Sequence, residues 1–256
     1  MRILKSDRYI NEKLGITPVT KERLTELKDY IPPITANDSN IHKLVRDAIK
    51  KYGNNANLNF IDTFQVTNMA ELFKDTKFNG DISKWDVSEV ENMEGMFYNS
   101  KFNGDISKWK VDCVVDMSYM FCKSAFNQDI SKWEVGNVEN MEGMFDFSVF
   151  NKDISDWDVY NVINMREMFS KSKFNKDISK WNVENVEDMS DMFSNSKFNK
   201  DISNWNVSNV KTMENMFFHA SFNKDLSKWN VANDTKIIGM FVFSPLEFNT
   251  PSWYKE

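Results

Sequence analysis

Large apolar side chains return at fixed positions every 24 residues along most of this chain. In residues 78–101 the apolar positions are held by Phe78, Ile82, Trp85, Val87, Val90, Met93, Met96 and Phe97. All eight tryptophans of the chain obey the same period, from Trp85 to Trp253. A fixed period of this length is typical of a solenoid, in which each repeat forms one coil and neighbouring coils bury each other's apolar side chains.

Within one coil, the apolar spacing changes from that of a strand to that of a helical turn. Trp85 and Val87 stand two residues apart, which puts both side chains on one face and predicts a strand over Ile82–Val87. From Val90 to Phe97 the spacings are three, three and one, which predicts a one-sided α-helical or 3₁₀ turn. Strands of successive coils are expected to pair in parallel, about 4.8 Å apart.

The sequence therefore predicts two parts, an N-terminal extension with a helical cap over residues 1–57 and a solenoid over residues 58–256 that ends in a degenerate coil. Ile41, Val45 and Ala48 have helical spacing, which predicts an amphipathic helix from about Ser39 to Gly53 that covers the end of the core. A second short helix is expected over residues 20–30, because two prolines follow it.

Two polar columns repeat as faithfully as the core. An Asn follows the first Phe of each coil, from Asn79 to Asn223, and we expect these amides to form a ladder. An Asp stands at one position of every coil, from Asp81 to Asp225. One carboxylate per coil supplies few of the six to eight oxygens that Ca²⁺ takes, so these side chains are expected to cap turns through backbone N–H groups.

The unit FNxDISxWxVxxVxxMxxMF resembles the repeat of the BspA-like family of bacterial surface proteins and lipoproteins; residues 150–157 are an example of its first part and residues 186–193 of its last part. Its shorter core, IxxWxVxxV, is similar to the LxxLxLxxN of leucine-rich repeats, with Val in place of Asn. The resemblance covers about residues 58–253. It implies a leucine-rich-repeat-like solenoid, often at the cell surface and associated with adhesion or protein binding, and no catalytic residues.

In the leucine-rich-repeat arrangement, strand residues that face away from the core line an exposed sheet. Here these are the neighbours of each Trp and the residue after the next Val, and they vary between coils while the core columns barely change. We expect a protein partner to contact Lys84, Lys108, Lys110, Lys132, Glu134, Asp156, Asp158, Tyr160 and Lys180.

Tyr160 is the expected anchor of this face, because Tyr is enriched at interface hot spots. The alternative is a solvated sheet whose mixed charges only avoid rows of like charge. A rival surface is the turn after each helical segment, which carries Tyr98, Tyr119, Phe147, Phe218 and His219.

Charge and composition exclude several classes of partner. The formal net charge is −6, with 32 basic and 38 acidic residues interspersed, so neither nucleic acid nor a polybasic membrane contact is expected. No apolar stretch has the length of a membrane span or of a signal peptide. With only Cys113 and Cys122 available for disulfides, the default prediction is a reduced, cytoplasmic protein, whereas the BspA-like resemblance implies the cell surface.

Catalytic chemistry has little support, because the two histidines, His42 and His219, are far apart and neither Cys has a His close in sequence. The sequence therefore predicts a non-enzymatic solenoid that needs no cofactor and binds a protein through its exposed strand face. The alternatives are a structural or assembly component that uses its N-terminal segment or its ends, a surface adhesin, and a carbohydrate-binding surface, against which every Trp belongs to the core. No oligomeric state is favoured.

Overall fold

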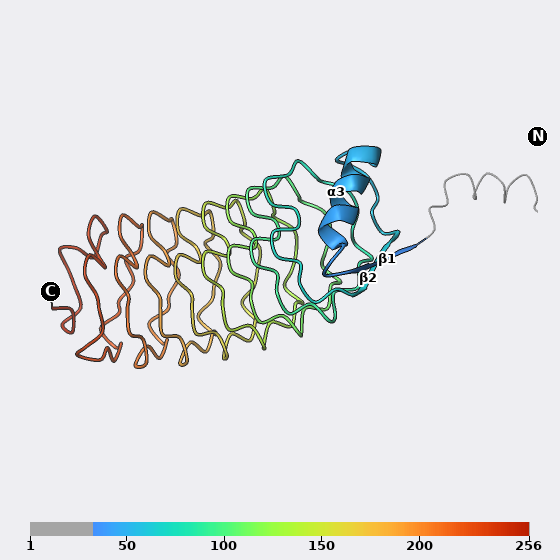
Figure 1. The fold of residues 1–256 in the computed structure, drawn as a ribbon. Coiled ribbons are helices and arrows are strands. Elements are labelled where there is room, and N and C mark those ends of the chain that lie inside the picture. The colour runs from blue at the N-terminus through green and yellow to red at the C-terminus, as the bar shows by residue number, and fades with distance from the viewer. Residues whose placement is uncertain (1–32, 256) are drawn as a thin grey trace, which may run out of the picture. The chain divides into compact units, whose positions relative to one another are not determined.

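The computed structural model describes residues 33–255, and the chain divides into two units, Met1–Pro33 and Ile34–Glu256. Figure 1 shows the second unit winding through a series of coils that lie side by side. We number seven complete coils, each 24 residues long: 78–101, 102–125, 126–149, 150–173, 174–197, 198–221 and 222–245. The second helix, expected over residues 20–30, lies outside the described residues.

The predicted core columns are buried. The seven tryptophans from Trp85 to Trp229 are 3–4% exposed, and the Met and Phe columns of coils 1 to 6 are fully buried. Phe rings of adjacent coils stack, with centroids 5.7 Å apart for Phe121 and Phe145 and again for Phe145 and Phe169. The prediction that the indoles point inward is confirmed for these seven, and Trp253 at the last turn is half-buried.

Each indole N–H donates a hydrogen bond to a backbone carbonyl of the preceding coil. The Trp157 indole, for example, lies 3.1 Å from the carbonyl oxygen of Ile130. The same bond forms at all eight tryptophans, at 2.8–3.2 Å. A buried donor without an acceptor costs about 1–3 kcal/mol, so these bonds are what allow a buried Trp column.

The segment predicted as a strand, Ile82–Val87, forms turns instead. Its first turn is closed by the Trp85 N–H, which donates to the Ile82 carbonyl at 3.1 Å. The side chain of Asp81 accepts the Ser83 N–H at 2.9 Å, which holds the chain out of the extended conformation. Adjacent coils pair in parallel at isolated bridges, one of which joins Asn92 to Asp116. Trp and Val still point inward, so alternation alone does not identify a strand.

The segment predicted as a helical turn, Val90–Phe97, also differs, because it continues into a row of β-turns with left-handed residues. Gly95 and Asn99 have φ values of +55° and +49°. Both columns keep a positive φ in every repeat from residue 71 to residue 243. In coil 1 the N–H groups of residues 93, 95, 97 and 99 donate to carbonyls of coil 2, whereas those of residues 96, 98 and 100 close turns within the coil.

Both polar columns hold adjacent residues in place. The Asn ladder forms, but its donor is a backbone N–H and not a side-chain amide: Asn127 N–H donates to the Asn103 oxygen Oδ1 at 2.8 Å, and this contact repeats from Asn103 to Asn223. The predicted Asp caps are confirmed in all seven coils, as where Asp129 Oδ1 accepts the Ser131 N–H at 2.9 Å.

Three named elements precede coil 1: the strand β1 (Ile34–Asn37), the helix α3 (Ile41–Tyr52) and the strand β2 (Ile61–Gln65). The predicted amphipathic helix is confirmed by α3, which buries Ile41, Val45 and Ala48. Strand β1 was not predicted, and it pairs in parallel with β2. Strand β1 and helix α3 fall within residues 1–57, the predicted N-terminal extension and helical cap. Ala36 of β1 and the buried face of α3 belong to the same hydrophobic core as the coils. Among residues 33–255, no helix is long and apolar enough to cross a membrane.

Candidate partner-binding face

The nine residues predicted to contact a partner are all exposed. In coil 3, for example, Trp133 and Val135 are buried while Lys132 and Glu134 point to solvent. The core residues thus hold the backbone and leave their neighbours free to contact other molecules. We call the exposed residues on either side of each Trp the charged face; from coil 1 to coil 7 they are Lys84 and Asp86, Lys108 and Lys110, Lys132 and Glu134, Asp156 and Asp158, Lys180 and Asn182, Asn204 and Asn206, and Lys228 and Asn230.

Two neighbouring hollows of opposite charge lie on this face. A hollow of about 350 Å³ is lined by three lysines, Lys108, Lys110 and Lys132, together with Asp112 and Glu134. The next, of about 470 Å³, is lined by four carboxylates and has no basic residue in its wall: Asp112, Glu134, Asp156 and Asp158. Asp112 and Glu134 line both hollows, so a basic region over coils 2 and 3 adjoins an acidic region over coils 3 and 4.

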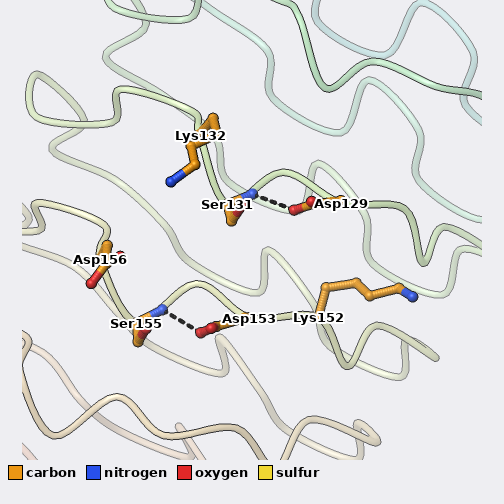
Figure 2. A pocket seen from close by; sticks show the side chains of 7 residues that line it. All are labelled: Asp129, Ser131, Lys132, Lys152, Asp153, Ser155 and Asp156. Carbon is orange, nitrogen blue, oxygen red and sulfur yellow. Dashed lines mark hydrogen bonds between the residues drawn. The ribbon is translucent and has the colours of Figure 1, made fainter.

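A third hollow, of about 410 Å³, lies between coils 3 and 4 and is drawn in Figure 2. Lys132 and Asp156 lie toward one side of it, and Lys152 extends on the other. Between them are the two Asp–Ser turns, whose backbone N–H groups hold the pKa of Asp129 and of Asp153 below the usual value for aspartate. These two carboxylates are therefore charged parts of the frame.

Six of the nine predicted residues line these three hollows, and Lys84, Tyr160 and Lys180 do not. Lys180 lies 3.2 Å from Asp156 across adjacent coils, and both side chains are largely exposed. Tyr160 is 43% exposed. Its backbone is fixed by two bonds: its N–H donates to Asp158 Oδ1, and its carbonyl accepts from the Asn185 amide.

Sequence reasoning placed Asp112 and Gly136 in an exposed column of the face but did not include them among the residues expected to contact a partner. Asp112 lines both charged hollows, and Gly136 lines the acidic one, where the missing side chain leaves room between coils 2 and 4. The available signal was a lone Gly in a column that otherwise carries side chains.

The rival surface is largely engaged within the coils. Lys123 Nζ lies 5.2 Å from the centre of the Tyr98 ring, and Lys171 Nζ lies 4.5 Å from that of Phe147. Burial and a hydrogen bond to Glu142 raise the pKa of Tyr119. Phe147 and His219 are exposed, whereas Tyr98, Tyr119 and Phe218 are half-buried. Over residues 33–255, no group of three or more His, Cys, Asp or Glu side chains is placed to hold a metal ion.

A comparison with known protein families finds one family whose model matches these repeats. Residues 39–149 and residues 146–253 each match the family described as Mycoplasma protein of unknown function, DUF285. The chain belongs to the DUF285 family. The two matches together span α3, β2 and all seven coils, so this DUF285 chain contains the family unit twice, in keeping with its internal repeats. No curated protein and no solved structure shows a significant match to the chain.

This DUF285 chain also buries one carboxyl group in an unfavourable position. Asp146 is 6% exposed, and its oxygen Oδ1 has no hydrogen-bond partner. Its other oxygen lies 3.7 Å from the sulfur of Cys122. Burial raises the pKa of Asp146, and burial together with the Asp146 charge raises the pKa of the Cys122 thiol to about 12. Cys122 is thus a poor nucleophile at neutral pH.

Replacing Asp146 by asparagine is expected to stabilise the fold by about 1 kcal/mol at neutral pH, because the substitution removes a buried charge. The folded pKa of Asp146 lies above the unfolded value, so the destabilising contribution is complete above the folded pKa and disappears as the pH falls below about 3.9. Urea unfolding from pH 7 down to pH 3.5 measures this difference. Asp156→Asn, an exposed control, should change stability little, and an Asp146→Asn gain that persists at low pH would contradict the explanation.

Proposed function

We propose that this chain is a non-enzymatic, protein-binding solenoid of the leucine-rich-repeat kind, similar in its repeat to BspA-like surface proteins, and that its charged face receives the partner. The observation that carries the proposal is the basic hollow directly beside the acidic hollow over coils 2 to 4. Charge arranged in this way selects a partner with the opposite pattern and accelerates its association.

Rigidity of the face supports the same interpretation. Side-chain amides of Asn137 and Asn161 donate to backbone carbonyls of the preceding coil at 2.7 Å, directly beside the hollows. Asn185 and Asn209 repeat this contact in later coils. A face whose backbone is already ordered loses little conformational entropy on binding, so more of the contact energy contributes to affinity.

The test is affinity capture with a charge-reversed face. The double variant Lys108→Glu/Lys110→Glu inverts the basic hollow, and we expect it to lose a partner that the unchanged chain retains from its native cell extract. Lys173→Glu/Lys197→Glu is the matched control, since it makes the same charge change at exposed positions outside the charged face. Equal capture by both double variants would overturn the proposal.

A second candidate function, assembly through the C-terminal coil, is favoured by one observation. Ile238, Phe243 and Phe248 are 70%, 65% and 92% exposed, more than any other large apolar side chain among the described residues. All three lie within eleven residues of the chain, and Phe243 also contacts the Phe218 ring. Exposed apolar surface of this kind is typical of interaction sites. If these residues carry the contact, Ile238→Ser/Phe243→Ser abolishes capture while Lys108→Glu/Lys110→Glu leaves it unchanged.

A further inference from the structure

We propose that the partner of the charged face is a second copy of this chain, bound face to face about a twofold axis that crosses coil 3. This inference rests on the proposed function, because it uses the same face. It starts from two pairs of residues. Of the seven coils, only coil 2 places lysines on both sides of its Trp, Lys108 and Lys110, and only coil 4 places aspartates on both sides, Asp156 and Asp158.

The positions of these two pairs make the face complementary to itself. Coils 2 and 4 are the immediate neighbours of coil 3, to which each is linked by a parallel bridge. A twofold axis that lies in the interface, perpendicular to the row of coils and centred on coil 3, sets coil 2 of one copy opposite coil 4 of the other. Lys108 then faces Asp156 of the second copy, and Lys110 faces Asp158 of the second copy. Symmetry repeats both contacts, which makes four pairs of opposite charge.

The coils around these two pairs add some contacts between like charges. Coil 3 lies on the axis, where Lys132 and Glu134 each meet the same residue of the second copy, but the coil carries one charge of each sign and therefore no net charge. Coil 1 lies opposite coil 5, where the repulsion between Lys84 and Lys180 of the second copy is offset by Asp86 beside it. When the axis is moved to the gap between coils 3 and 4, Lys132 meets its opposite, Asp156 of the second copy. Lys108 then meets Lys180 and Glu134 meets Asp158 of the second copy, so like charges face each other at two positions and opposite charges at one. Only the axis at coil 3 places each double-charged coil against its opposite.

The acidic residues of the face are available for these contacts. Asp156 is paired within its own copy to Lys180, but the two side chains are 67% and 73% exposed, and an exposed pair of this kind contributes little. Because the proposed contacts are mainly between exposed charges, the dimer should weaken as salt is added.

The test compares two charge-swapped chains by analytical ultracentrifugation of the full protein. The first carries Lys108→Asp/Lys110→Asp, and the second carries Asp156→Lys/Asp158→Lys. Each alone places like charges opposite each other across the axis, so each should dimerise at least about tenfold more weakly than the unchanged chain. An equal mixture should dimerise again, because every swapped pair then meets its opposite. The unchanged dimer should dissociate between about 0.05 M and about 0.5 M salt.

Three results would overturn the proposal: an unchanged chain that is monomeric at low salt, a dimer that neither swap weakens, and a mixture that stays monomeric. Lys173→Asp/Lys197→Asp is the matched control and should dimerise normally. Tryptophan fluorescence establishes that each variant is folded, since the indoles are buried. If the unchanged chain is monomeric and Lys108→Glu/Lys110→Glu still loses a captured protein, the second copy is excluded while the proposed function stands.

Discussion

Replacing Trp157 by alanine is expected to lower the free energy of unfolding by about 3–5 kcal/mol, the largest effect of any single substitution considered. The side chain is 3% exposed and lies in coil 4, with complete coils on both sides. Its loss leaves a cavity that neighbouring coils cannot fill, because their backbones are held to one another by hydrogen bonds such as the one from Met141 N–H to the Asn164 carbonyl. The Ile130 carbonyl also loses its indole donor.

Urea unfolding followed by circular dichroism measures this loss, and two further variants divide it into parts. Trp157→Phe keeps much of the volume but removes the N–H, and the Ile130 carbonyl keeps the Trp133 backbone N–H as a donor, so about 0.5–1.5 kcal/mol of the loss should remain from the missing hydrogen bond. Trp253→Ala should cost much less, because this tryptophan is only half-buried. A Trp157→Phe variant as stable as the unchanged chain would show that the indole hydrogen bonds contribute nothing.

Replacing Gly80 by alanine is the second substitution with a large expected effect, a loss of about 3 kcal/mol or more. A Cβ atom at Gly80 would lie 1.9 Å from the carbonyl oxygen of Ala56 and 2.8 Å from the Phe78 ring. The first obstacle is backbone, and the same carbonyl accepts the Asp81 N–H at 3.1 Å. Relief therefore requires the incomplete coil before coil 1, residues 54–77, to move away from coil 1 and break this bond.

Gly104→Ala is the matched control one coil later. There the nearest atoms are the Phe102 ring at 2.8 Å and the Gly80 carbonyl oxygen at 3.3 Å, and later coils carry Gln128 and Lys152 in the same column. The loss at Gly104 should therefore be below about 1 kcal/mol. Hydrogen exchange at the Asp81 and Leu58 amides reports the predicted opening, and equal losses in both variants would refute the backbone clash as its cause.

The core of this protein could be predicted from its sequence because burial depends on which side chains are apolar and how often they return. The Trp, Met and Phe columns, the buried face of α3 and the exposure of all nine face residues follow from that pattern. The Asp caps were also predictable, since an Asp reaches the backbone N–H two residues ahead without help from another coil.

The turns could not be predicted in the same way, because strands and turns both place Trp and the following Val on one side. Likewise, a helical turn and a row of β-turns both bring Val90, Met93 and Phe97 inward. What separates them is the set of hydrogen bonds from one coil to the next, which requires positive φ at Gly95 and Asn99. Asn is among the residues that tolerate this conformation, but Phe147 and Lys171 adopt it in the same column, so residue type does not reveal it.

For the candidate site as well, some features followed from the sequence and others only from the structure. By itself the sequence determined which residues are exposed beside the buried tryptophans, because a period of 24 places chemically similar positions in columns. Only the tertiary structure decided that Lys108 and Lys110 share a hollow with Glu134, and that Asp112 and Gly136 border the acidic hollow. The physical reason is that the backbone bonds between coils, which fix how residues of neighbouring coils lie beside one another, need no particular side chain, so the sequence does not show them.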